Sequence, residues 1–169
     1  PNLNLTALQV MEGTNLVEIG AGGGTAITET YNRTRVTLRA TVHNQGDLFA
    51  SSVFVRFYNG DPIPANLIGT SNTIPSISTG NLAYATFIWE ALSSDLMQIH
   101  TINAIAYANA GLVSNQMSQA LTVYDNRADL ELVDVTLENN ATNIVGNTVF
   151  SVNVTVTNNG LWTAQGIAV

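Results

Sequence analysis

Few residues in this sequence are of types that perform acid–base, nucleophilic or metal chemistry. The chain has two histidines, His43 and His100, and no cysteine. Neither histidine has a neighbouring carboxylate or a second histidine at metal-ligand spacing. A catalytic triad needs a base oriented by an acid, and the linear sequence proposes none. We therefore predict no catalytic residue, no cofactor and no metal site, and we interpret both histidines as strand-surface or partly buried side chains.

A glycine-rich stretch, Gly20-Ala-Gly-Gly-Gly24, invites comparison with nucleotide-binding loops. The dinucleotide fingerprint would require a glycine where Thr25 stands, and a P-loop would require Gly-Lys. The basic residues are all arginine, so Schiff-base chemistry and lysine–asparagine isopeptide crosslinks are excluded as well. We expect Gly20–Gly24 to be a flexible loop.

Oxygen-bearing side chains gather near residue 125. Asp125, Asn126, Asp129 and Asp134 would suit Ca²⁺, which can stiffen a module boundary. Their spacing matches no known calcium loop, however. We interpret them as solvated charges.

Asn-X-Ser/Thr sequons offer sites for covalent modification. The candidate glycosylation sites are Asn4, Asn32, Asn140 and Asn153. Their number is close to chance for a chain this rich in Asn, Ser and Thr, so their placement is more informative. Asn4 and Asn153 fall on the polar phase of predicted strands and Asn140 in a predicted turn, where each could carry a glycan.

Composition excludes several partners. The net charge of −7 and the pI near 4.4 argue against binding to nucleic acid, because no basic surface would replace the counterions of the phosphates. No apolar run approaches the roughly 18 residues of a membrane helix, so we expect no membrane span in this segment. Charged residues make up only 10% of the chain, and such uncharged polar surfaces suit secreted, glycosylated or closely assembled proteins.

The first 124 residues alternate apolar and polar side chains in short runs. These runs are bounded by Asn, Gly, Asp and Pro, which favour turns, and no stretch has convincing helical periodicity. The pattern predicts an all-β chain, an Ig-like antiparallel β-sandwich of about seven strands. The predicted strands are 2–12, 34–43, 52–58, 67–74, 82–89, 98–108 and the end of 114–124.

Part of this pattern recurs near the C-terminus. Ala40–Gly46 matches Val154–Gly160, and Asn2–Glu12 matches the segment that begins at Asp129. In both opening strands the apolar phase reverses midway, after Leu5 in the first copy. One residue of slip reverses the facing of every later side chain, so we expect a bulge or sheet switch at equivalent positions.

We therefore divide the chain into a sandwich at 1–124, a short junction at 125–127 and the first strands of a second Ig-like domain at 128–169. The apolar residues of this incomplete second sandwich would face nothing, and burying each is worth roughly 1.5 to 3 kcal/mol. We expect further chain or a neighbouring copy to complete it by β-strand addition.

Three stretches carry a resemblance to a known family: Leu3–Thr6, Thr41–Gly46 followed by Val53–Gly60, and Phe87–Trp89 followed by His100–Ala106. The chain resembles the CARDB type of prokaryotic Ig-like domain, a cell-adhesion-related module of surface proteins. The resemblance implies tandem surface modules and no reaction. Such domains tend to carry acidic residues after the penultimate strand, where this chain has none, so the resemblance gives no support to a cation site.

The sequence thus predicts a non-enzymatic structural subunit of an extracellular or cell-surface prokaryotic filament or rod, built from tandem Ig-like domains joined end to end. Its expected partners are neighbouring copies or adjacent Ig-like domains, with covalent glycans. The alternative is an adhesion or carbohydrate-binding spacer module of a larger secreted protein. An exposed aromatic platform would favour that alternative, and Trp162 is the best candidate for it in the sequence, although packing at a domain junction is the preferred interpretation of this residue.

Overall fold

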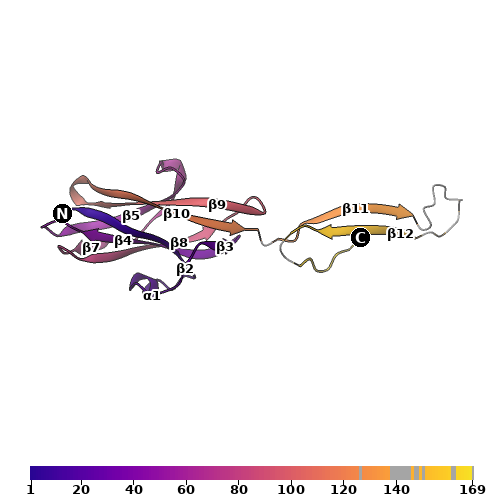
Figure 1. Ribbon diagram of the computed structural model, residues 1–169, viewed down its shortest axis with the longest axis horizontal. Coiled ribbons are helices and arrows are strands. Elements are labelled where there is room, and N and C mark those ends of the chain that lie inside the picture. The colour runs from indigo at the N-terminus through magenta and orange to yellow at the C-terminus, as the bar shows by residue number, and fades with distance from the viewer. Residues whose placement is uncertain (126, 138–145, 147–148, 150, 161–162, 169) are drawn as a thin grey trace. The chain divides into compact units, whose positions relative to one another are not determined.

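The computed structural model describes residues 1–125, 127–137, 146, 149, 151–160 and 163–168. The chain divides into two compact units, Pro1–Tyr124 and Asp125–Val169, which are called unit 1 and unit 2 and are described separately. Strands dominate both units (Figure 1). The predicted all-β sandwich is confirmed, with more strands than expected because short ones occupy the connections.

One sheet of unit 1 has four strands in the spatial order β2-β1-β4-β8, all antiparallel. Its long central strand β4 pairs with β8 without interruption from Thr34 opposite Ala91 to His43 opposite Leu82. The strands are β1 (Leu3–Met11), β2 (Ala26–Ile27), β4 (Thr34–Asn44) and β8 (Leu82–Ala91).

The second sheet has the order β3-β10-β9-β5-β6, and β7 also pairs with β5. All its pairs are antiparallel except that of β3 with β10, which is parallel. The strands are β3 (Glu29–Tyr31), β5 (Ala50–Asn59), β6 (Leu67–Thr70), β7 (Ile74–Ile77), β9 (Met97–Ala108) and β10 (Leu112–Tyr124).

The core of unit 1 lies between these two sheets. Alternate residues of each strand face inward, as a half-buried antiparallel strand requires. In β5, for example, Val53, Val55 and Phe57 are fully buried. Gly69 faces the ring of Phe87, and a Cβ at this position would overlap that ring, so only glycine fits there.

The predicted phase reversal in β1 is confirmed. The pairing of β1 with β4 shifts between Leu5 and Ala7, which leaves Thr6 as an extra, exposed residue. Leu5 and Leu8 consequently both reach the core, at 2% and 4% exposure. A β-bulge of this kind lets one strand keep its apolar side chains inward on both sides of a bend.

The bulge also joins the first strand of unit 1 to its last. The side chain of Asn115, on β10, accepts a hydrogen bond from the Leu5 N–H at 2.6 Å and donates one to the Leu5 carbonyl at 3.1 Å. Asn115 lies where the pairing of β10 with β9 is itself irregular. The register shift in β1 and the register shift in β10 thus bring the Asn115 side-chain amide against the backbone of Leu5.

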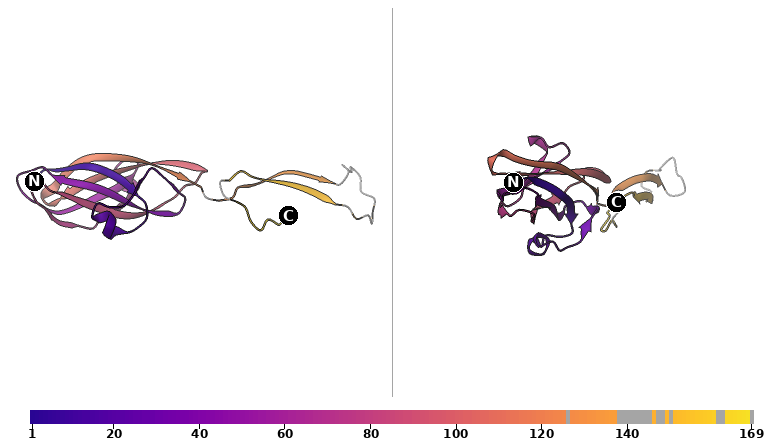
Figure 2. Two further views of the ribbon diagram at one scale, coloured as in Figure 1. Left: turned by 60° about the horizontal axis from the view of Figure 1, so that its bottom comes forward. Right: turned by 60° about the vertical axis from the view of Figure 1, so that its left-hand side comes forward.

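The expectation of no helix was wrong. A short α1 (Leu16–Gly20) follows β1, with the Asn15 side chain accepting a hydrogen bond from the Glu18 N–H, and 3₁₀ turns occupy Pro64–Asn66 and Asn109–Gly111. Figures 1 and 2 show α1 outside the four-stranded sheet. A helix of one turn is too short to show a period of 3.6 residues, and it depends on tertiary packing, here through the buried Ile19.

In unit 2 the two strands β11 (Leu130–Leu137) and β12 (Val152–Asn158) pair antiparallel. Their pairing shifts between Leu132 and Asp134, so Val133 takes the place that Thr6 has in unit 1. The repeated phase reversal predicted from the sequence is therefore present in both copies.

Asn44 ends β4 and is fully buried. Its Oδ1 accepts hydrogen bonds from the N–H groups of Asn2 and Gly46, both at 3.2 Å. Its Nδ2 donates to the carbonyls of Leu48 at 2.8 Å and Ile77 at 3.0 Å. One side chain thus provides partners for backbone groups of the N-terminal segment, of the turn after β4 and of the end of β7.

This arrangement generates a first prediction. Asn44→Asp keeps the shape and the acceptor but places a buried carboxylate against two carbonyl oxygens. We expect the free energy of unfolding, measured by urea titration, to fall by more than about 3 kcal/mol because an unpaired charge is buried. The exposed Asn72 supplies the matched control, since Asn72→Asp should change it by less than about 0.5 kcal/mol. Equal effects of the two variants would contradict this role.

Candidate functional site

The end of β4 and the end of β12 share one hydrogen-bonding arrangement. In unit 2 the Oδ1 of Asn158 accepts from the N–H groups of Asp129 and Gly160, both at 3.1 Å. These partners correspond to Asn2 and Gly46 in unit 1. The backbone bond from Gln45 to Asn2 at 2.8 Å is likewise repeated by one from Asn159 to Asp129 at 2.7 Å. We call this repeated arrangement the Asn-X-Gly clasp.

The glycine of the clasp is required by a close approach of two chain segments. A Cβ on Gly46 would lie 2.5 Å from the amide nitrogen of Asn2, and one on Gly160 would lie 2.5 Å from that of Asp129. Such separations do not occur for real Cβ atoms, and backbone is less able to yield than a side-chain tip. The repeat is therefore one of three-dimensional contacts as well as of sequence.

The register of the strand pair is repeated too. Leu3 opposes Asn44 as Leu130 opposes Asn158, and Leu5 opposes Val42 as Leu132 opposes Val156. β11 and β12 therefore correspond residue by residue to β1 and β4. The residues of β11 and β12 that should face a core can be read directly from unit 1.

Four of those residues are exposed in unit 2, whereas Leu137, Val154 and Val156 are half-buried. In unit 1 the counterparts Leu3, Leu5, Leu8 and Leu38 are at most 5% exposed. In unit 2 the equivalent residues are 45% to 59% exposed, and they form what we call the β11–β12 apolar face: Leu130, Leu132, Val135 and Val152. A set of large aliphatic side chains held on one face of a two-stranded sheet is typical of an interaction surface.

The two histidines have structural positions. His43 is half-buried on β4, opposite Asn4 and Leu82. His100 is 5% exposed, and its Nδ1 and Nε2 lie 2.9 Å from Asn59 Nδ2 and 2.7 Å from the Leu92 carbonyl. These partners suit a neutral ring that donates from Nε2 and accepts at Nδ1. Both ring nitrogens of His100 are thus occupied by local contacts.

The glycine-rich loop is packed against the four-stranded sheet. Arg39, which is 7% exposed, donates from Nη1 to the carbonyls of Ile19 at 3.3 Å and Gly23 at 2.7 Å. Its Nη2 donates to Gln9 Oε1 at 2.8 Å, and its guanidinium lies 5.3 Å from the centre of the Tyr84 ring. The carbonyls of Ile19, in α1, and of Gly23, in the loop, therefore solvate a buried cation, an arrangement opposite in charge to the phosphate cradle of a nucleotide loop.

The acidic residues near residue 125 do not converge in the part of the chain that the structure describes. The carboxylate of Asp125 is engaged by Arg127, with Nη2 at 2.7 Å and Nε at 2.8 and 3.0 Å. Among the described residues no group of three or more His, Asp or Glu side chains is placed to hold a metal ion. Asn126 lies outside the described residues.

The sequon asparagines differ in accessibility. Asn153 is exposed and Asn4 is half-buried. Asn32 is 7% exposed, and its Oδ1 accepts a hydrogen bond from the Ser93 N–H at 2.9 Å. Asn140 lies outside the described residues. The sequence analysis singled out Asn4, Asn140 and Asn153 by their placement, but it could not show that Asn32 is buried, because that burial depends on a loop distant in the chain.

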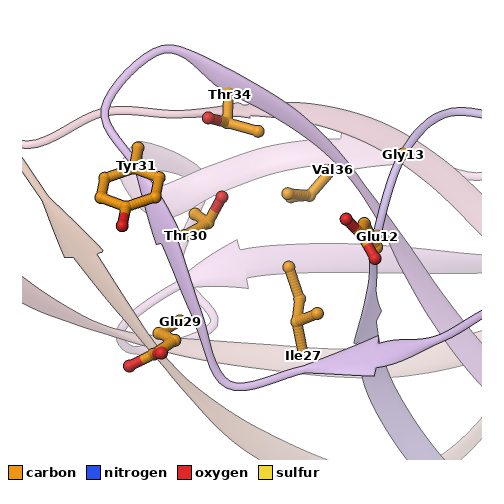
Figure 3. Close-up of a pocket in the computed structure, with 8 residues that line it drawn as sticks. All are labelled: Glu12, Gly13, Ile27, Glu29, Thr30, Tyr31, Thr34 and Val36. Atoms are coloured by element: carbon orange, nitrogen blue, oxygen red, sulfur yellow. The ribbon is translucent and has the colours of Figure 1, made fainter. Parts of the chain in front are cut away.

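A pocket of about 260 Å³ opens beside β2 and β3 in unit 1 (Figure 3). Ile27 and Val36 supply an apolar part, and Glu12 and Glu29 lie on opposite sides of the pocket in this view. Paired carboxylates for acid–base catalysis must flank one reacting bond. The remaining lining residues are Gly13, Thr30, Tyr31 and Thr34, which include neither a strong nucleophile nor a cation.

A cluster of aromatic side chains and one arginine lies on the outer face of the second sheet, and the sequence analysis missed it. Phe54 on β5 opposes Tyr107 on β9, and their rings stack with centres 5.4 Å apart. The Arg56 guanidinium lies 5.0 Å from the Tyr107 ring centre and 5.6 Å from that of Phe54. We call Phe54, Arg56 and Tyr107 the Arg56 platform. The sequence did contain one signal: Phe54, Arg56 and Tyr58 alternate along β5 with the core residues Val53, Val55 and Phe57.

The Ig-like sandwich and the second copy of its first strand pair define a class of protein, the modular β-sandwich. Residues 19–110, more than half of the chain, match the CARDB family. The chain belongs to the CARDB family. CARDB is a non-enzymatic domain family that is typical of surface and secreted proteins.

No curated protein matches the chain. Among solved structures the chain is similar to that of a superoxide reductase (neelaredoxin) from Ignicoccus hospitalis. The sequence identity is 14%, the match covers 71% of this chain and 82% of that chain, and the TM-score is 0.41. Within the described residues, no helix has the length and apolar character needed to span a membrane.

The Arg56 platform generates a prediction about pH. Burial raises the pKa of Tyr107 above its ordinary 10.0, the Tyr58 hydroxyl adds to this rise, and Arg56 opposes it. The folded state thus holds the phenol proton more tightly than the unfolded state. This contribution to stability is complete below about pH 10 and is lost as the pH rises further.

Urea unfolding between about pH 9 and pH 11 should therefore show a smaller loss of stability in Tyr107→Phe than in the unchanged chain. An identical decline in Tyr107→Phe and in the unchanged chain would contradict the assignment.

Proposed function

We propose that this chain is a non-enzymatic structural subunit of an extracellular prokaryotic filament or surface rod, in which tandem Ig-like domains join end to end. The observation that carries the proposal is the second copy of the clasp and strand pair. It has the register and bulge of the first copy, yet it presents the β11–β12 apolar face uncovered.

Strand complementation explains this face. In unit 1 the corresponding surface of β1 and β4 is covered by the second sheet, with Val55, Phe57 and Leu121 among the core residues. Equivalent strands from further chain or from a neighbouring copy would cover β11 and β12 in the same way. Either source joins one module to the next, and contacts between unlike surfaces extend an assembly without closing it.

Three polar groups that could do chemistry are engaged by local partners. The ring of His100 is held by local partners, Arg39 is enclosed by a loop and the carboxylate of Asp125 is paired with Arg127. Family membership agrees with a module whose work is mechanical or adhesive.

Adhesion through carbohydrate is the second candidate function, because the structure has an aromatic platform on an outer sheet face. The aromatic residue that the sequence suggested for this role, Trp162, lies outside the described residues. The Arg56 platform consists of residues of unit 1.

The assembly proposal predicts association that depends on the β11–β12 apolar face. The chain should form larger species as its concentration rises, and Leu132→Asp combined with Val135→Asp should abolish them because charges would be buried in the contact. Light scattering after size-exclusion chromatography measures the masses. Asn153→Asp adds a charge to the same strand pair at an exposed polar position and should leave association unchanged.

Electron microscopy of the native material tests the same proposal independently of the isolated chain. Elongated particles with a regular axial repeat are the expected result. Single compact particles, together with a monomeric chain at all concentrations, would overturn the assembly.

Glycosylation is a separate part of the proposal and follows the accessibility of the sequons. Peptide mass spectrometry of native material should find glycan on Asn153 and Asn4, since these asparagines are accessible on their strands, and none on the buried Asn32. An intact mass equal to that of the unmodified polypeptide would dispose of this expectation without affecting the assembly.

A further inference from the structure

We propose that the outer face of strands β5, β9 and β10 in unit 1 binds carboxylate-bearing sugars, that is, uronic acid residues of an acidic polysaccharide. The site consists of the Arg56 platform and the row of side chains that continues from Arg56 across the sheet. This inference rests on unit 1 alone and is independent of the assembly proposed above.

Arg56 is positioned as an anion-binding group. It is exposed, and its guanidinium is held against Tyr107 and Phe54 by cation–π contacts. Within the described part of the chain the ion pair is that of Arg127 with Asp125, so Arg56 has no carboxylate partner there. A planar guanidinium fixed on aromatic rings keeps donors that match a carboxylate.

A row of side chains leads from Arg56 across the two neighbouring strands. Arg56 on β5 opposes Ile105 on β9, and Ile105 opposes Gln116 on β10. Two strand spacings separate Arg56 from Gln116, which is about 10 Å. This span accommodates one pyranose ring over the half-buried Ile105, with its carboxylate at Arg56 and its hydroxyl groups at Gln116.

The polar end of the row is held in place by hydrogen bonds. Asn103 is 5% exposed and donates from Nδ2 to the Gly60 carbonyl at 2.7 Å. Its Oδ1 accepts from Gln116 Nε2 at 2.9 Å and from the Ser118 hydroxyl. Gln116 is thus oriented through its amide nitrogen, while its Oε1 can accept a hydrogen bond from a sugar hydroxyl.

The backbone around this surface favours a sugar over a peptide. β9 is hydrogen-bonded to β5 on one side and to β10 on the other, and β5 is paired with β6 and β7 on its second side. An extended peptide that binds by strand addition needs a free sheet edge, which β9 and β5 do not provide. The outer side of β10 pairs with β3 only over Thr122–Tyr124, so a peptide could add at that edge of the sheet but not on this face. Recognition at this face must use side chains, and aromatic, amide and guanidinium groups are suited to sugar rings and their carboxylates.

The negative charge of the chain makes the site depend on one residue. With a net charge of −7, the protein as a whole repels anions. Binding of an acidic sugar must therefore depend on a local cation, and Arg56 is the arginine that β5, β9 and β10 supply. Removing it should weaken binding strongly, whereas removing another exposed arginine should not.

The test is titration of the full chain with an oligogalacturonate, followed by isothermal calorimetry. We expect binding that Arg56→Gln weakens by at least about tenfold, because a charge-assisted bidentate contact is lost. Arg35→Gln is the matched control, since Arg35 is exposed on β4 of the other sheet. It should retain the affinity, and the fully methyl-esterified oligosaccharide should not bind.

NMR chemical-shift mapping on the unchanged chain keeps the proposal falsifiable if a variant misfolds. Shifts induced by the oligogalacturonate should concentrate on Arg56, Tyr107 and Gln116. Absence of binding, shifts confined to other strands, or equal losses in Arg56→Gln and Arg35→Gln would overturn the site. Equal binding of a glutamate oligomer would also overturn it, in favour of an acidic peptide ligand.

Discussion

This fold depends on one constraint. The backbone N–H and C=O groups around the end of β4 must find hydrogen-bond partners. Asn44 meets it in unit 1 by bonding two N–H groups and two carbonyls with one amide. Gly46, two residues after Asn44, allows its backbone to approach that of Asn2 closely. This short motif fixes the register of β1 against β4, and the register decides which side chains enter the core. The same motif recurs at Asn158, so the core-facing positions of β11 and β12 can be assigned from those of β1 and β4.

The sequence predicted the sandwich well because its long strands alternate cleanly, and a reversal of phase in β1 could mean only a bulge or sheet switch. It failed where structure depends on distant contacts. One turn of helix at Leu16–Gly20 has no readable period, and it is held by the buried Ile19 and by Arg39. The glycine-rich segment was interpreted as flexible for the same reason, since nothing local shows that Arg39 donates to the Gly23 carbonyl.

Of the two candidate surfaces, one could be predicted from the sequence and the other depends on contacts between distant residues. The β11–β12 apolar face was visible in the sequence as a second copy of a core-forming pattern. The Arg56 platform was not, because it joins β5 to β9, and only the pairing of Phe54 with Tyr107 brings these side chains together. Cross-strand neighbours on an outer face carry no periodic signature, so such a cluster becomes apparent only once register is known.

The bond pair between Asn115 and Leu5 has a mechanical consequence. These residues belong to the last and first strands of unit 1, and the amide grips both the N–H and the carbonyl of the same residue. Leu5 is also paired with Val42 on β4. Displacement of β1 from unit 1 therefore requires that both bonds to Asn115 on β10 break together with the pairing to β4.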